Sequence, residues 1–278
     1  MVTTDMATTE KLTSSNKIVD LHCHLLPGID DGSPDLEHSL QLAQDAVAEG
    51  ITHILATPHH LDGGDYVNHK ADVIQHVNAF QAELDKQKIP LTIFPGGQEV
   101  HINGDLLERY ADLLGGVDEA KHYMLIEFPH GSVPAYAQRL FFELRKQGTT
   151  PIIVHPERNH ELQENMNMLY DFIADGALAQ LTATSYIGGF GPKVQQISEQ
   201  FVTHGLVQLF ASDAHALKGR KFALREAFLA LRAQHDQAKV DQFEQNAEDL
   251  LNGLPVMAKG GYSRIAEKRK KKVLFSFK

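Results

Sequence analysis

The stretch Ile18-Val19-Asp20-Leu21-His22-Cys23-His24 decides the fold, because a short apolar run passes directly into two histidines that are two residues apart. Side chains at this spacing on a strand face the same way, so both imidazoles can reach one site. Six further apolar runs precede, in chain order, His59, Glu99, Glu127, His155, the segment 182–185, and Asp213 with His215. Ligands gathered at the C-terminal ends of successive parallel strands are how a β/α barrel assembles a site from distant sequence.

Stretches with helical patterns separate these runs. In the first, Ser33 is the expected N-cap, Pro34 the first helical residue and Gly50 the stop. Its expected apolar stripe consists of Leu36, Leu40, Ala43 and Val47. Further helices are expected near residues 70–88, 135–147, 161–175, 192–204, 220–235 and 240–251. Seven alternating units favour right-handed crossovers, a parallel sheet and a closed or nearly closed (β/α)7 TIM-like barrel.

Length and composition fit one large α/β domain, since the chain has 278 residues and is 42% apolar. We expect this domain to span residues 17–252, after a disordered Thr- and Ser-rich leader at 1–16 and before a basic tail at 253–278. No apolar run approaches the roughly 20 residues that cross a bilayer, and no secretory signal is recognisable. The single cysteine, Cys23, suits a reducing compartment, so we expect a soluble cytoplasmic protein.

Charge is unevenly distributed along the chain. The formal net charge is -10, yet residues 259–278 contain eight Lys/Arg and one Glu. An acidic body does not suit sequence-independent binding to nucleic acid, and it leaves any anionic substrate to be attracted locally, by metal ions and a few arginines. The basic run at residues 268–272 is either a solvated tail or a contact for an anionic membrane surface or an acidic partner.

Each candidate ligand alone has an ordinary explanation, such as a surface histidine or a helix-capping aspartate. Glu127 is harder to explain in this way, because it lies in an apolar segment where an unpartnered carboxylate is costly. Asp30-Asp31-Gly32 is typical of a turn, although a carboxylate there can swing back over the barrel mouth. Co-occurrence at strand ends is what favours a shared metal site over independent surface residues.

Two other phosphate-handling patterns are absent. Cysteine-dependent tyrosine phosphatases need an arginine six residues after the cysteine, and here Ile29 stands six residues after Cys23. Cys23 is therefore expected to be a buried spacer, and no Walker-type Gly-Lys-Ser/Thr element is present. The Gly-rich segment 188–191 is typical of a loop over the barrel mouth, where Tyr186 and Phe190 could flank an aromatic substrate.

The motifs together resemble a known superfamily. They are His22-Cys23-His24, Asp30-Asp31-Gly32, Ala56-Thr57-Pro58-His59, Gly97-Gln98-Glu99, Leu125-Ile126-Glu127-Phe128, His155-Pro156-Glu157-Arg158 and Ala211-Ser212-Asp213-Ala214-His215. In this order and spacing they resemble the polymerase-and-histidinol-phosphatase (PHP) superfamily. Within it they are most similar to the manganese-dependent bacterial protein-tyrosine phosphatases of capsule and exopolysaccharide operons.

This resemblance implies a distorted seven-stranded barrel with three divalent metal ions. It assigns His22, His24, Glu99 and Asp213 to one ion; Glu99, Glu127 and His155 to a second; and Asp31, His59 and His215 to the third. It also implies that Arg158 and Arg220 contact the substrate phosphate. Five imidazoles and four carboxylates without a thiolate suit Mn²⁺, Fe²⁺ or Zn²⁺.

The expected activity is therefore hydrolysis of phosphotyrosine on protein, on the tyrosine-rich tail of a membrane-associated bacterial tyrosine kinase that controls polysaccharide synthesis. We expect a metal-bound hydroxide to attack phosphorus, with His59 or His215 available to protonate the leaving group. A small-molecule phosphoesterase such as a histidinol phosphatase is the alternative, because the barrel and the ligands are shared. A non-enzymatic docking module of the polysaccharide machinery is a third interpretation.

Overall fold

The structure is a computed structural model, and it describes residues 18–61, 66–113, 122–216, 219–256 and 261–266. The expected leader and the basic run at 268–272 lie outside the described residues. Within them, the strands are β1 (Ile18–Cys23), β2 (Ile51–Ala56), β3 (His59–His60), β4 (Thr92–Phe94), β5 (Glu99–His101), β6 (Tyr123–Glu127), β7 (Thr150–Val154), β8 (Leu178–Thr182) and β9 (Leu209–Ala211). The α-helices are α1 (Leu36–Ala48), α2 (Lys70–Gln87), α3 (Ala137–Lys146), α4 (His160–Glu164), α5 (Met166–Ala174), α6 (Ala183–Tyr186), α7 (Pro192–Thr203), α8 (Leu224–Gln234) and α9 (Gln237–Leu251).

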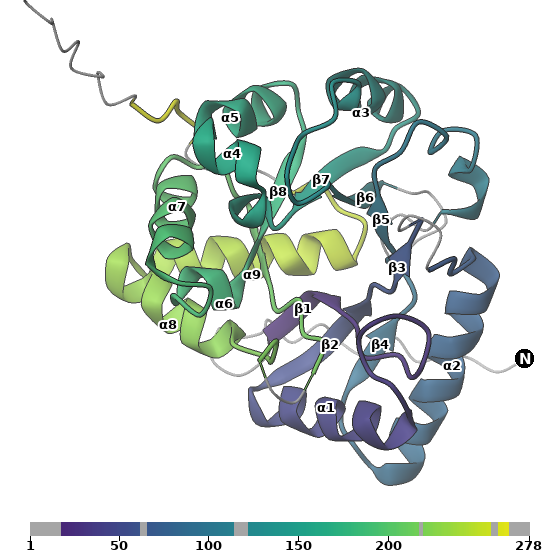
Figure 1. Ribbon diagram of the computed structural model, residues 1–278. Helices are drawn as coiled ribbons and strands as arrows, with labels where there is room; N and C mark the ends of the chain where they lie inside the picture. Colours follow the sequence, from purple (N-terminus) through teal and green to yellow (C-terminus); the bar gives the residue numbers. More distant parts are fainter. Residues whose placement is uncertain (1–17, 62–65, 114–121, 217–218, 257–260, 267–278) are drawn as a thin grey trace, which may run out of the picture.

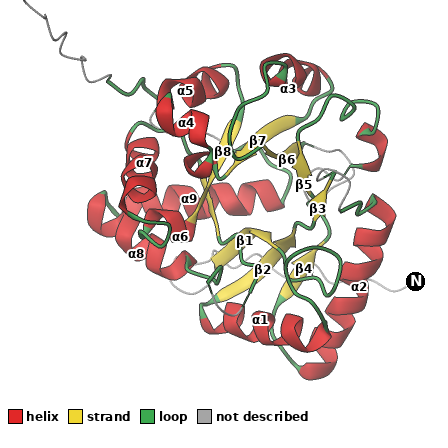
Figure 2. Cartoon of the chain, in the orientation of Figure 1, coloured by secondary structure: helices red, strands yellow, loops and turns green. Residues whose placement is uncertain are grey.

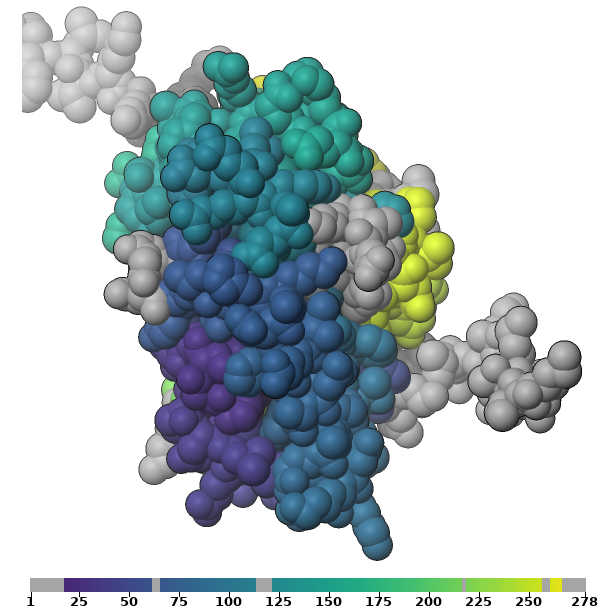
Figure 3. All heavy atoms as spheres, turned by 90° about the vertical axis from the view of Figure 1, so that its right-hand side faces the viewer, coloured from purple at the N-terminus to yellow at the C-terminus, as the bar shows by residue number. Residues whose placement is uncertain are grey.

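The strands occupy the centre of the molecule and helices surround them, as Figure 2 shows. Every pairing between these strands is parallel, in two sheets with the orders β1-β2-β4 and β3-β5-β6-β7-β8-β9 (Figure 1). The expected parallel α/β architecture is therefore confirmed. In the space-filling view of Figure 3, the purple and blue first third of the chain lies below its teal middle, in line with the division into two sheets.

The sequence predicted a closed or nearly closed barrel, but the strand pairing among the described residues forms two separate sheets and no closed barrel. Two of the expected strands are each broken into two short ones, at Pro58 between β2 and β3 and at residues 95–98 between β4 and β5. Proline has no N–H to donate to a ladder, so Pro58 ends the pairing of β2. The second halves then pair with each other, and His59 stands opposite Glu99.

The two sheets are joined where β1 and β9 end. Cys23 forms an isolated parallel bridge with Ala214, and the N–H of Asp213 donates to the carbonyl of His22 over 2.9 Å. Cys23 is buried, as the sequence predicted. The register of β1 against β2 shifts between Asp20 and Cys23, which interrupts the regular alternation of side chains along β1. Leu21 consequently belongs to the apolar cluster between the sheets, whereas Cys23 belongs to the outer core.

One apolar cluster is shared by both sheets. It contains Leu21, Leu55, Tyr123, Leu125, Ile152, Val154, Leu178, Leu209 and Ala211 from the strands, with Ala247, Leu250 and Leu251 from α9. The helix α9 therefore packs on this strand cluster, and it lies against β1 and β9 (Figure 1). A larger cluster between the strands and the surrounding helices forms the outer core.

Several helix boundaries differ from the predicted ones. Asp35, not Ser33, caps α1, because its carboxylate accepts the N–H of His38 over 2.8 Å while the Ser33 hydroxyl bonds elsewhere. The buried face of α1 is Ser39, Leu42, Ala43 and Ala46, so the predicted stripe is rotated and Leu36 is exposed. The helix expected at 161–175 is broken at Asn165, and α8 starts four residues later than expected because the Arg220 carbonyl accepts from His215.

The described part of the expected tail packs onto the domain. The Tyr123 hydroxyl donates to the Leu254 carbonyl over 2.6 Å, and the buried Ile265 exchanges hydrogen bonds with Asn167. The folded unit therefore extends beyond residue 252. Among the described residues, no helix combines the length and the apolar character that crossing a bilayer requires.

The carboxylate of Asp20 holds the junction between the sheets. It is fully buried and accepts the Ser212 hydroxyl at 2.5 Å and the Ser212 N–H at 3.0 Å. We predict that Ser212→Ala lowers the free energy of unfolding by about 1–3 kcal/mol, because a buried carboxylate oxygen loses its donor. Urea denaturation measures this difference.

Ser198→Ala is the matched control. Ser198 is equally buried, but its hydroxyl donates to the Val194 carbonyl of its own helix, so its removal is expected to cost less than about 1 kcal/mol. Equal losses of stability in the two variants would contradict a special role for the hydrogen bonds between Ser212 and the Asp20 carboxylate.

Candidate metal centre

Glu99 lies at the centre of the candidate site. The side chain is fully buried, and its Oε2 is 3.2 Å from Nε2 of His22, 3.2 Å from Nε2 of His24 and 3.1 Å from Nδ1 of His59. Metal–ligand bonds of about 2.1 Å place neighbouring ligand atoms roughly 3.0–3.4 Å apart, so this spacing suits side chains that share an ion. Together with Asp213, the residues His22, His24 and Glu99 present ligand atoms that all lie within 4.8 Å of one another.

A second group uses the other oxygen of Glu99. Oε1 is 2.8 Å from Nε2 of His155, and the same nitrogen is 3.6 Å from Oε1 of Glu127. Glu99 therefore belongs to both groups, one on each side of its carboxylate. His155 and Asp213 have left-handed backbones, with φ of 34° and 53°, at the strand ends where their side chains join the cluster. Such conformations are costly for residues other than glycine and occur preferentially at functional sites.

A third group surrounds Asp31, which is 46% exposed at the rim of the cluster. One carboxylate oxygen, Oδ1, is 3.2 Å from Nε2 of His59 and 3.2 Å from Nε2 of His215. His24 also belongs to this group, and its ring stacks on that of His215 with centroids 3.7 Å apart. The structure thus brings together all nine side chains that the resemblance assigns to metal ions.

Buried polar atoms without hydrogen bonds support a metal at this place. Oε2 of Glu99, Oδ1 of Asp213 and Nδ1 of His59 are buried and make no hydrogen bond. Leaving such atoms unsatisfied costs free energy, particularly for carboxylates, and divalent cations would satisfy them. The residues present therefore fit metal ions.

Two polar partners orient His22, in β1, and His24, directly after this strand. Nδ1 of His22 is 2.8 Å from Oε1 of Gln180, and Nδ1 of His24 is 2.8 Å from Oδ2 of Asp30. Each contact leaves Nε2 directed at Glu99, as a ligand histidine requires. Sequence reasoning missed the role of Gln180, because a glutamine inside a strand carries no signal for it. The sequence indicated a role for the Asp30-Asp31 pair, but it did not indicate that Asp30 contacts His24 whereas Asp31 contacts His59 and His215.

His101 is a further residue that the sequence analysis did not identify. It lies in β5, two residues after Glu99, and Nε2 makes a very close contact with Oε2 of Glu127. With His59 and Glu127 it forms a fourth group with metal-ligand spacing. The signal was present in the sequence, because His101 follows Glu99 at the same two-residue spacing that separates His22 from His24.

Tyr186 does not face the site, so its expected place beside an aromatic substrate was wrong. It is fully buried, its ring packs against Phe210, and its hydroxyl donates to Oε1 of Gln234 over 2.6 Å. The short helix α6 turns this side chain into the outer core. Phe190, four residues later, is 39% exposed.

The electrostatics follow from packing carboxylates against imidazoles. Burial acts to raise the pKa of Glu99, but His22 and His155 hold it well below its usual range. Burial acts to lower the pKa of His24, yet the Asp30 and Glu99 carboxylates raise it to about 10. In His215, burial and the neighbouring His24 lower the pKa to about 4.

Two arginines border the cluster at Asp213. Nη2 of Arg220 is 2.6 Å from Oδ2 of Asp213, and Nη1 of Arg158 contacts the same oxygen closely. This leaves Oδ1 of Asp213 facing His22. Nε of Arg220 is buried and makes no hydrogen bond. Positive charge therefore converges on the edge of a site whose interior is rich in carboxylates.

Parallel strands with histidines and carboxylates converging at their C-terminal ends define a β/α protein with a candidate polynuclear metal centre. The chain belongs to the capsular polysaccharide synthesis family CpsB/CapC, whose model matches residues 18–252. The resemblance inferred from the motifs is confirmed at this level.

Individual relatives agree with the family assignment. The tyrosine-protein phosphatase YwqE of Bacillus subtilis is 38% identical over 261 residues, which cover 94% of this chain and 100% of that protein. The tyrosine-protein phosphatase CpsB of Streptococcus agalactiae is 25% identical over 246 residues, or 84% and 98% of the two chains. A solved chain from the crystal structures of YwqE and of Streptococcus pneumoniae CpsB, described as metal-dependent tyrosine phosphatases, matches with a TM-score of 0.82 and 38% identity, covering 86% of this chain and 96% of that one.

We predict that metal binding releases protons. Because the pKa of His24 is raised to about 10, its ring holds a proton at neutral pH that a metal ion must displace. Apparent Mn²⁺ affinity should therefore rise between pH 6 and pH 9, by about tenfold per pH unit for each displaced proton. Titration calorimetry in two buffers of different ionisation enthalpy measures the release, and a pH-independent affinity would contradict it.

We also predict that Gln180→Met weakens metal binding by about 10- to 100-fold, because the His22 ring loses the acceptor that orients it. Equilibrium dialysis against Mn²⁺ measures the change. Gln41→Met is the control, since the Gln41 side chain donates a hydrogen bond to Asp45 on the exposed face of α1. Unchanged affinity in Gln180→Met would show that the His22 ring is positioned without this contact.

Proposed function

We propose that the protein is a metal-dependent phosphatase that hydrolyses phosphotyrosine on protein. The observation that carries this proposal is the pair of arginines on Asp213, at the edge of the histidine and carboxylate cluster. A site that takes up only cations gains nothing from two guanidinium groups, whereas a phosphate that bridges cations and arginines uses both. The tyrosine-protein phosphatases named among its relatives support the substrate class.

The proposed ligands are the nine side chains named above, in three groups around Glu99. Bound divalent ions would offset phosphate charge and lower the pKa of a coordinated water. Mn²⁺ is our proposed metal, with Fe²⁺ or Zn²⁺ as the other ions that this donor set suits. His101 is an additional ligand candidate beside Glu127.

The arginines would bind and orient the phosphate. Asp213 holds Arg158 and Arg220 in place through one oxygen, and each guanidinium keeps further N–H groups for an anion. These donors would stabilise the equatorial oxygens as charge develops in the transition state. The lowered pKa of His215 keeps its ring neutral, which suits a metal ligand better than a proton donor. We assign His59 the same role, since a tyrosyl oxygen is a good leaving group without protonation.

The two sheets would together make the distorted seven-stranded barrel typical of the PHP superfamily. The broken strands β2–β3 and β4–β5 count as one strand each in this view, and the apolar cluster shared by both sheets fills the interior. We take residues 17–252 as the catalytic unit, in agreement with the span of the family match.

The proposed substrate is the tyrosine-rich tail of a membrane-associated bacterial tyrosine kinase. The description of the family, capsular polysaccharide synthesis, supports this context. We further propose that the basic run at 268–272 contacts the anionic membrane surface and brings the enzyme close to this substrate. This would place the reaction in the cytoplasm.

Chelator-treated protein should regain hydrolysis of a phosphotyrosine peptide on addition of Mn²⁺, with little activity on histidinol phosphate in the same assay. Arg158→Lys should lower kcat/KM for the peptide by about 10²-fold, because a lysine cannot keep both the Asp213 contact and the planar contact with phosphate. Arg264→Lys is the control, since Arg264 pairs with Asp171 away from the cluster. Preference for histidinol phosphate would overturn the proposed substrate class and leave the metal centre intact.

A further inference from the structure

Phe190 is the exposed aromatic side chain beside the phosphate-binding edge of the site. Single exposed apolar residues are common and need no explanation. Phe190 differs from these because its ring lies against the guanidinium of Arg158, with Cζ 5.4 Å from the ring centroid. The same guanidinium contacts Asp213. One arginine therefore connects the candidate metal centre to an aromatic surface that is 39% exposed.

Backbone hydrogen bonds hold the segment that carries Phe190. The N–H of Gly189 donates to the Thr184 carbonyl over 2.8 Å, and the N–H of Gly191 donates to the Gly188 carbonyl over 2.9 Å. Gly189 has no room for a side chain, since a Cβ would lie 2.4 Å from Cγ2 of Thr184. Gly191, with φ of 90°, is the N-cap of α7. The ring is therefore presented by a turn whose backbone is fixed on both sides.

A buried carboxylate ties this turn to the segment that carries Arg158. Oε1 of Glu157 accepts the Ser185 hydroxyl over 2.6 Å and the Thr182 N–H over 3.2 Å. Glu157 is fully buried and directly precedes Arg158. The positions of the arginine and of the ring are thus set by one hydrogen-bonded unit.

We propose that Phe190 forms the aryl-binding wall of the site, and that it selects phosphate esters of tyrosine over ring-free phosphates by packing against the phenyl ring of the substrate. The inference rests on the proposed phosphatase function. A phosphate held by Arg158 would bring the aryl group of its ester close to Phe190, because the guanidinium lies 5.4 Å from the centroid of that ring. Two aromatic rings in offset or edge-to-face contact attract each other beyond the area they bury.

The test compares a substrate that has a ring with a ligand that has none. In Mn²⁺-loaded protein, Phe190→Ala should raise KM for a phosphotyrosine peptide by about 3- to 10-fold. The inhibition constant of inorganic phosphate should change less than about twofold, because the metal ions and arginines that bind it remain. Phe190→Tyr should keep the wild-type KM, and Phe190→Leu should lie between Tyr and Ala.

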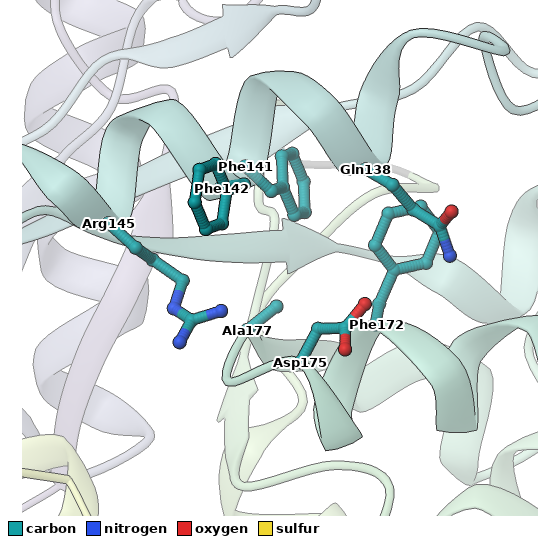
Figure 4. Close-up of a pocket in the computed structure, with 7 residues that line it drawn as sticks. All are labelled: Gln138, Phe141, Phe142, Arg145, Phe172, Asp175 and Ala177. Carbon is teal, nitrogen blue, oxygen red and sulfur yellow. The ribbon is translucent and has the colours of Figure 1, made fainter.

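Phe142→Ala is the matched control. Phe142 is 57% exposed on α3, and its ring also lies near a cation, with Nζ of Lys146 5.7 Å from the centroid. It borders a cavity of about 150 Å³ that is also lined by Arg145 and Phe172, outside the strand cluster (Figure 4). This variant should leave both constants unchanged.

Two results would overturn the inference. An unchanged KM in Phe190→Ala would show that the ring does not contact the substrate. An equal rise in KM and in the phosphate inhibition constant would show that Phe190 acts only by holding Arg158. If the wild-type protein hydrolyses no phosphotyrosine peptide under these conditions, this result contradicts the proposed phosphatase function, and with it the role of Phe190. Activity in the wild type with no effect in Phe190→Ala removes only the aryl-binding wall.

Discussion

The buried carboxylate of Glu99 is the constraint on which the site depends. Its Oε2 is surrounded by nitrogens of three histidines at 3.1–3.2 Å, and its Oε1 faces a fourth. Burying a carboxylate away from water is costly, and Oε2 of Glu99 makes no hydrogen bond that would offset this cost. Cations between these atoms would remove the cost, and the cluster of buried carboxylates and imidazoles therefore suits metal ions. The breaks at Pro58 and at residues 95–98 follow from the same demand, since they allow β3 to pair with β5 beside the cluster.

Asp213 connects the candidate metal centre to the two arginines that are proposed to bind phosphate. One of its oxygens faces the histidines, and the other holds both arginines. The junction below it is fixed by the Asp20 carboxylate, whose pKa burial raises to about 6 despite the hydrogen bonds from Ser212. Asp213 therefore positions both arginines and also belongs to the candidate metal centre, so a substitution of Asp213 is expected to affect both. Phe190 lies against Arg158, so an exposed aromatic ring is connected to Asp213 through this arginine.

The sequence predicted the parallel α/β architecture and the proximity of the nine candidate ligands well, because strand-end position is a local property that a short motif carries. It predicted less well whatever depends on tertiary packing. The breaks in two strands, the rotated face of α1 and the burial of Tyr186 each depend on neighbours that are distant in sequence. Gln180 orients His22 from β8, a contact across 158 positions that no spacing rule reveals. His101 could have been found, since its two-residue spacing from Glu99 matches the spacing between His22 and His24.

Anomalous diffraction at the manganese edge, from crystals of the Mn²⁺-loaded protein, tests the central claim most directly. The account predicts anomalous peaks on both sides of the Glu99 carboxylate, one within bonding distance of His22 and His24 and one near His155 and Glu127. Peaks that lie only outside this cluster, with the Glu99 carboxylate in contact with histidines alone, would contradict it.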